Sequence, residues 1–210
     1  MKNRVLGTLV FLVVGTTNIL VGQEVVEFVV PTPGAIVAGL AAGPDGNIWF
    51  TENIQSGGRL PLLLSNGIWR ISGTGAISEF HLSGGGGVGL AATAAGPVFG
   101  FGGSFWFAEA SFFPIPQAAI EEGTPTGSLT QFDVTSAVSS LTYGPDGNIW
   151  FIAPATVAAT ATIGSITTSG VITTFDLPAR SAPSAIAAGS DGNLWFTETT
   201  NNQVDRKSVV

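Results

Sequence analysis

Three glutamates stand at the same distance from a tryptophan in this chain of 210 residues. Glu52, Glu109 and Glu198 each follow a Trp by three residues, in the segments WFTE, WFAE and WFTE. Carboxylate oxygens are the ligands that magnesium and calcium prefer, and a carboxylate also accepts hydrogen bonds from backbone N–H groups. The spacing predicts either a ligand face, with magnesium or calcium held by Glu198, Glu52 and Glu109, or three glutamates that only accept structural hydrogen bonds.

The elements that position these glutamates come from an internal repeat. Trp-Phe pairs begin at Trp49, Trp106, Trp150 and Trp195, and a second anchor recurs at Phe28, Phe80, Phe132 and Phe175. Turns such as GPDGN separate short alternating segments, because Pro, Asp and Gly supply the backbone angles of tight turns. Four short strands in each unit of about 40–50 residues predict an all-β fold, a β-propeller. Equivalent positions in successive blades share one rim, although Ala153 stands where the third unit would place its Glu.

Composition narrows the class of protein. Lys2 and Arg4 precede an apolar run at 5–14, which predicts that residues 1–22 are a secretory signal peptide and that residues 23–210 form the propeller domain. Without the signal the chain has five Lys/Arg against fourteen Asp/Glu, a net charge of −9. This charge predicts no nucleic-acid partner and no membrane partner after cleavage. The sequence contains no cysteine, which excludes disulfides. We expect a secreted or periplasmic protein.

The repeat resembles that of the virginiamycin B lyase (streptogramin lyase) family. The resemblance covers residues 24–204, and its motifs here are APSAIAAGSDGNLWFTE (182–198), IGSITTSGVITTFDLP (163–178) and GPDGNIWFTE (43–52). It implies a β-propeller, which in the enzymes of the family has seven blades. It also implies, for those enzymes, a magnesium-dependent, non-hydrolytic opening of the ester of a cyclic depsipeptide.

Two positions depart from the family's pattern. The lyases have a histidine, an acid two residues before it, and the glutamate of W-F-T-E in the same blade. Glu198 matches that glutamate, whereas Ser184 replaces the histidine and Ala182 replaces the acid. Elimination needs a base with a pKa near the working pH, which imidazole supplies and a neutral serine does not. The one histidine of the chain, His81, is expected as a solvated side chain on an outer strand.

The two ends of the repeat array look complementary. Residues 204–208 match a third strand, and EVVEFVV at 24–30 matches a fourth strand. We expect four blades of four antiparallel strands, closed into a ring by the N-terminal strand, which also removes two exposed sheet edges. The alternative is an open partial arc of a seven-bladed propeller.

Three functions follow from these observations. The first is an exported binding or interaction module without the catalytic histidine, whose ligand is a small molecule, a peptide or a glycan. The second is a magnesium-dependent carbon–oxygen lyase that opens a cyclic depsipeptide ester of the streptogramin B type. The third is a truncated propeller remnant without a function of its own. The loss of the histidine favours the first, since propellers host many functions and the fold alone does not decide.

Overall fold

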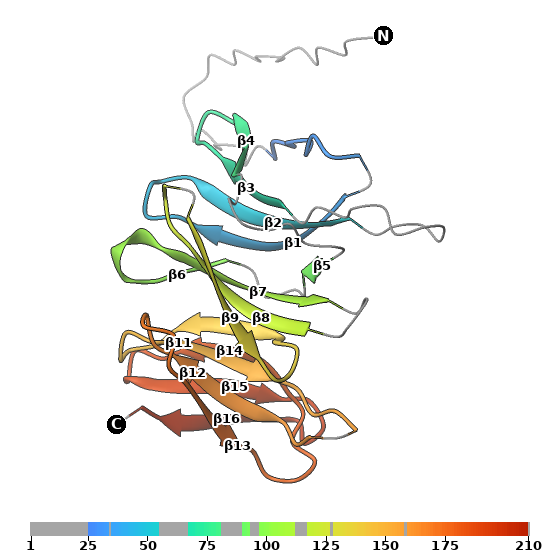
Figure 1. Ribbon diagram of the computed structural model, residues 1–210, viewed down its shortest axis with the longest axis vertical. Helices are drawn as coiled ribbons and strands as arrows, with labels where there is room; N and C mark the ends of the chain where they lie inside the picture. Colours follow the sequence, from blue (N-terminus) through green and yellow to red (C-terminus); the bar gives the residue numbers. More distant parts are fainter. Residues whose placement is uncertain are drawn as a thin grey trace, which may run out of the picture.

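The computed structural model describes residues 25–33, 35–54, 67–80, 90–92, 97–111, 117–126, 128–157 and 159–209. These residues are almost entirely β-structure, with one short 3₁₀ turn, η1 (Phe101–Gly103), as their only helix. No helix within them is long and apolar enough to cross a membrane. Four antiparallel sheets, blades 1 to 4 in chain order, stack along the longest axis of the molecule (Figure 1). The all-β propeller prediction is confirmed; the predicted signal peptide lies outside the described residues.

Each blade is built from consecutive strands, as the repeat predicts. Blade 1 contains β1 (Ala35–Ala42), β2 (Ile48–Ile54), β3 (Gly67–Ile71) and β4 (Ile77–Phe80). Blade 2 contains β5 (Leu90–Ala92), β7 (Phe105–Ser111), β8 (Gln117–Gly123) and β9 (Leu129–Val134), and the short β6 (Val98–Phe99) pairs with β7. Blade 3 contains β10 (Ser140–Tyr143), β11 (Ile149–Ala153), β12 (Thr162–Ile166) and β13 (Ile172–Asp176). Blade 4 contains β14 (Pro183–Ala188), β15 (Asn193–Glu198) and β16 (Gln203–Ser208).

The repeated Asp-Gly-Asn turn and the tryptophan that follows it form one structural unit. In blade 3 the carboxylate of Asp146 accepts hydrogen bonds from the backbone N–H of Asn148 at 3.2 Å and from Nε1 of Trp150 at 2.9 Å. Gly147 has a φ of 82°, in the left-handed region that favours glycine. The same bonds join Asp45 to Trp49 and Asp191 to Trp195. The turn motif thus fixes the indole ring near the start of the second strand in blades 1, 3 and 4.

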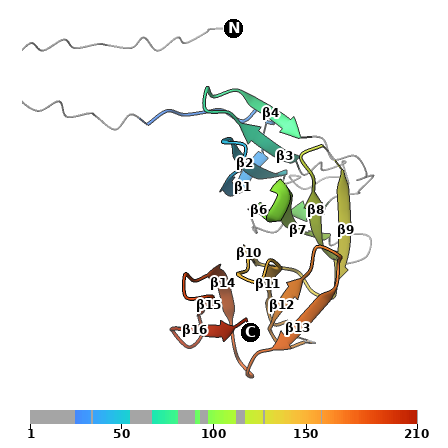
Figure 2. The ribbon, with the colours of Figure 1, turned by 90° about the vertical axis from the view of Figure 1, so that its left-hand side faces the viewer.

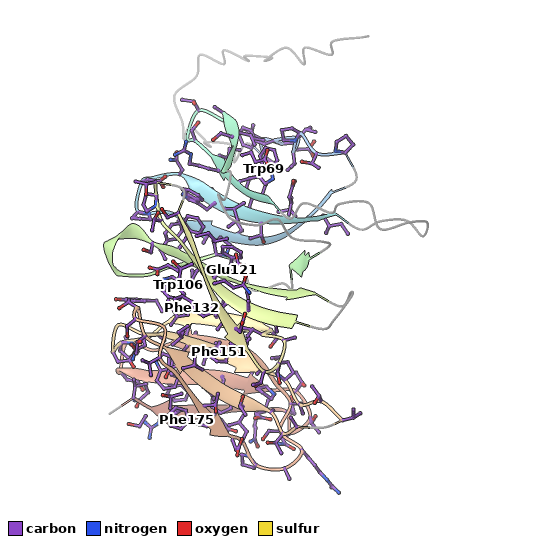
Figure 3. All side chains as sticks on the ribbon, viewed as in Figure 1. Trp69, Trp106, Glu121, Phe132, Phe151 and Phe175 are labelled. Carbon is purple, nitrogen blue, oxygen red and sulfur yellow. The ribbon has the colours of Figure 1, made fainter. Side chains whose placement is uncertain are left out.

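The hydrophobic core lies between neighbouring blades rather than inside each one. Between blades 2 and 3, Trp106 and Ile120 pack with buried side chains of β10 and β11. Between blades 3 and 4, Trp150 and Ile163 pack with buried side chains of β14 and β15. Within a blade the two sequence anchors meet: Trp106 stacks on Phe132 with ring centroids 5.6 Å apart (Figure 3). Each blade therefore buries its apolar surface by using its neighbour.

The blades form an open arc, with first strands on the inner side and fourth strands on the outer side (Figure 2). Closure by the N-terminal strand, our preferred prediction, is wrong for this structure, and the alternative, an open arc, describes it. Blade 4 has three strands, and residues 25–30 form none. Phe28 packs against Gly75 of blade 1, where a Cβ would collide with its ring. The N-terminal segment thus contacts blade 1 at the turn between β3 and β4, and β16 is the last strand of its sheet among the described residues.

Candidate functional site

The predicted glutamates lie near the ends of the second strands, on one rim of the arc. Glu198 is the last residue of β15, Glu52 lies in β2, and the backbone of Glu109 lies in β7. The side chain of Glu109 is outside the described part of the structure. Ala153 takes the corresponding place in β11, as the sequence shows.

Glu198 is buried, with 2% of its surface exposed. Its Oε2 accepts a hydrogen bond from the backbone N–H of Ala182 at 2.8 Å, just before β14 begins. The next residue, Thr199, also binds Ala182, through a bond from its backbone N–H to the Ala182 carbonyl at 3.0 Å. The other oxygen of Glu198, Oε1, is buried and has no hydrogen-bond partner among the described residues. The Oε2 atom therefore holds the backbone just before the first strand of blade 4, whereas Oε1 makes no described hydrogen bond.

Glu52 occupies an equivalent place in blade 1. It is 2% exposed, its Oε1 accepts a hydrogen bond from Oγ1 of Thr32 at 2.7 Å, and its Oε2 is buried without a described partner. Thr32 lies three residues before β1, and Ala182 lies one residue before β14. The two glutamates thus share a structural task, which is to hold the segment that leads into the first strand of the blade.

The structure does not bring Glu52 and Glu198 together. They belong to the first and last blades of the arc, and no group of three or more His, Asp or Glu side chains within the described ranges is arranged to hold a metal ion. In blade 4 one carboxylate oxygen is free, whereas a magnesium ion needs a nearly octahedral set of oxygen ligands. The described residues of this blade alone do not fit such an ion, and no chemical step is derived through one.

Ser184 and Thr197 are paired beside Glu198. Their hydroxyl oxygens are 2.8 Å apart, and Oγ1 of Thr197 also accepts a hydrogen bond from the backbone N–H of Ala185 at 3.1 Å. Both side chains are neutral and exposed. Ala182 contributes a backbone N–H here and no acid. His81, the chain's single imidazole, lies outside the described residues.

A hollow of about 390 Å³ lies before the start of β14, and Ser184, Thr197 and Glu198 are not among its lining residues. It is lined by residues 155–157, 159–161 and 178–181, which belong to the connections from β11 to β12 and from β13 to β14. Arg180 is one of the two described non-glycine residues with positive φ, at 73°, and it contributes the charged side chain of the lining. Sequence reasoning missed this hollow, since these connections have no periodic pattern.

Sheets of consecutive antiparallel strands, joined at apolar junctions into an arc, define the class as β-propeller repeat proteins. A sequence profile of the virginiamycin B lyase family matches residues 97–209. The chain belongs to this family. Comparison with curated proteins gives no match.

Solved structures agree with this assignment. Selenomethionine-substituted virginiamycin B lyase from Staphylococcus aureus is 30% identical, with a TM-score of 0.63, and the match covers 87% of this chain and 58% of that one. A catalytically inactive His-to-Ala variant of the same enzyme, solved with quinupristin, is 30% identical, with a TM-score of 0.60 and coverage of 86% and 58%. A gluconolactonase from Xanthomonas campestris shares only the fold, at 14% identity, a TM-score of 0.53 and coverage of 82% and 58%. The chain therefore spans less than two thirds of the length of these proteins.

Proposed function

We propose that this chain is a binding module of the virginiamycin B lyase family that holds a cyclic peptide or depsipeptide without opening it. One observation carries the proposal: Ser184, which replaces the histidine of the family's pattern, pairs with another neutral hydroxyl, that of Thr197, at 2.8 Å. In the described structure these hydroxyls are hydrogen-bonded to each other and to the backbone N–H of Ala185, and none of these groups is a general base. Neither hydroxyl therefore gains the basicity that proton abstraction beside a carbonyl requires.

The comparisons support binding without catalysis. The Staphylococcus aureus variant that carries Ala in place of a histidine is described as catalytically inactive, yet it was solved with quinupristin. A propeller of this family can thus lack an essential histidine and still be solved with such a ligand. By analogy, the replacement of a base by Ser184 would leave a binding surface in place while removing the chemistry.

The hollow between the β11–β12 and β13–β14 connections is the ligand position that we propose. Glu198 holds Ala182, and the adjacent Ser181 lines the hollow, so the buried carboxylate fixes one wall. Ser181 is itself tied back by a bond from its N–H to the carbonyl of Pro178 at 3.0 Å. The guanidinium of Arg180 supplies donors for the carbonyl oxygens of a peptide ligand.

Calorimetric titration of the purified chain with quinupristin, with and without magnesium, tests the proposal. We expect measurable heat and, in parallel chromatography of the same mixtures, intact cyclic ligand. Arg180→Ala should weaken binding by about fivefold or more, the loss of one charged hydrogen bond. Arg206→Ala is the matched control, because Arg206 lies in β16 and does not line the hollow.

Two results would contradict the proposal. Opening of the quinupristin ring at an ordinary enzymatic rate would establish the lyase and require another base. The absence of heat with quinupristin, with peptides and with glycans would favour a remnant without a binding function of its own.

We also propose that the protein is exported and begins near Gln23. The support is the basic head and apolar run of residues 1–22. N-terminal sequencing of protein recovered outside the cytoplasm should give Gln23 or a near neighbour. Material that starts at Met1 and stays in the cytosolic fraction would refute export.

A further inference from the structure

The last blade exposes side chains that the internal junctions bury. Trp195 and Val204 are 39% and 60% exposed. Their counterparts in blade 3, Trp150 and Ile163, are 4% and 0% exposed. The strand registers establish the equivalence, because Val204 pairs with the residue two places after Trp195, just as Ile163 pairs with the residue two places after Trp150.

The first blade exposes the opposite half of the same junction. Leu40 and Ile48 are 70% and 37% exposed, whereas their blade 3 counterparts, Leu141 and Ile149, are 8% and 2% exposed. Leu40 pairs with the Phe of the Trp-Phe dyad of its blade, as Leu141 does. In blade 3, Leu141 and Ile149 face blade 2, and the equivalent face of blade 1 is exposed to solvent. The opposite face of blade 3 packs on blade 4, and the equivalent face of blade 4 is exposed.

The N-terminal segment already behaves like an outer strand of a blade that precedes blade 1. Phe28 packs on Gly75, in the turn between β3 and β4. Phe132 of β9 packs on Gly170, in the turn between β12 and β13 of the following blade, in the same way. Residues 25–30 therefore lie where the fourth strand of such a blade would run, and the blade with three described strands is blade 4.

We propose that two copies of this chain associate end to end, each packing its blade 4 on blade 1 of the other. Residues 25–30 of one copy then lie beside β16 of the second copy as its fourth strand. A second copy is the occupant that these faces favour, because it presents at each end the residue types that the internal junctions place there. Both end blades border the open side of the arc, so a twofold axis joins both ends at once (Figure 2).

The internal blades predict the pairing between the copies. Phe175 pairs with Ile163 in blade 3, so Phe28 should pair with Val204 of the second copy and Glu27 with its Asp205. Two acids directly opposite each other weaken an antiparallel pair. Replacement of either one by Lys should therefore tighten the association by roughly twofold to fivefold, and replacement of both should not.

Sedimentation of the purified chain tests the association. We expect twice the monomer mass at micromolar concentration. Leu40→Glu and Val204→Glu should each weaken association by more than about 100-fold, because each places an unpaired charge in an apolar junction. Val171→Glu is the matched control, since Val171 is 59% exposed, as Val204 is 60%, but lies in the turn that precedes β13.

Cysteine cross-linking tests the pairing without relying on destabilising variants, because the natural chain has no cysteine. Glu27→Cys mixed with Asp205→Cys should give a covalent pair under mild oxidation, and neither variant should cross-link alone. In a chain that carries both substitutions, a disulfide within one monomer would show closure of its own ring and overturn the proposal. Sedimentation of the wild-type chain as a monomer at all concentrations would overturn the proposal as well.

Discussion

The indole Nε1 of Trp150 donates a hydrogen bond to the carboxylate of Asp146 at 2.9 Å, and 4% of this tryptophan is exposed. Asp146→Ala leaves the buried donor unpaired and removes the bonds to Asn148. We expect the free energy of unfolding to fall by about 2–3 kcal/mol, measured by urea denaturation. Asp191→Ala is the control: it removes the same bonds in blade 4, but Trp195 is 39% exposed and water can replace its partner. Its cost should be about 1 kcal/mol, and equal costs would contradict the role of burial.

The stability of the fold should fall in acid through the same turns. Hydrogen bonds from the side chains of Asn193 and Trp195 hold the pKa of Asp191 below its ordinary value of 3.8. Burial raises the pKa of Asp45, but the bonds from Asn47 and Trp49 outweigh it, so that pKa is also lowered. The stability that a depressed carboxyl pKa contributes is present above the unfolded value and is lost as the pH falls through the folded one.

We therefore expect the melting temperature to drop below about pH 4, the region of the unfolded aspartate pKa. Asp191→Asn, whose side chain does not titrate, should lose less melting temperature than the wild type as the pH falls from about 5 to about 2. Identical pH profiles for the two proteins would show that this turn does not contribute.

Glu198 should be a structural acceptor whether or not it touches a ligand. Glu198→Ala removes the acceptor for the N–H of Ala182 in a buried site and should cost about 2–4 kcal/mol. Glu198→Gln keeps an acceptor oxygen and should cost about 1 kcal/mol or less. Chemical denaturation measures both, with Glu122→Gln as the partly exposed control. An unchanged Glu198→Ala protein would mean that the bond to Ala182 does not hold the entry into blade 4.

The glycine in the turn between β12 and β13 should tolerate no side chain. Gly170 has a φ of 85°, and a Cβ there would collide with the ring of Phe132. Gly170→Ala should therefore lower the free energy of unfolding by about 2–4 kcal/mol, through backbone strain together with overpacking. Gly192→Ala, with positive φ and open space, should cost about 1 kcal/mol, and Gly73→Ala, with open space and no positive φ, should be nearly neutral. Equal costs at Gly170 and Gly192 would rule out the contact with Phe132.

The strands and turns could be predicted because their signals are local. The Asp-Gly-Asn turn fixes Trp150 through contacts within four residues, and the same letters recur in blades 1 and 4. Closure could not be predicted in this way, because whether residues 25–30 reach the edge of β16 in the same chain depends on the summed curvature of the blades. Local periodicity carries no information on that sum.

Only the local features of the candidate site could be predicted from the sequence. The sequence places Glu52 and Glu198 at equivalent strand ends, and the structure agrees. Their burial arises from contacts with Thr32 and Ala182, which are 20 and 16 residues away along the chain. The hollow near Arg180 depends on how the β11–β12 and β13–β14 connections pack against each other. The spacing of residues in the sequence does not predict this packing.

Because the apolar clusters lie between blades, the cooperative unit of this protein is the junction and not the blade. Loss of an end blade removes one junction, whereas loss of an internal blade removes two. In the separate monomer, melting should then proceed inward from the ends, as in a one-dimensional array of coupled neighbours. Amide protons of β11 and β12, which lie between two junctions, should exchange more slowly than those of β16, whose outer edge has no partner strand in the described arc.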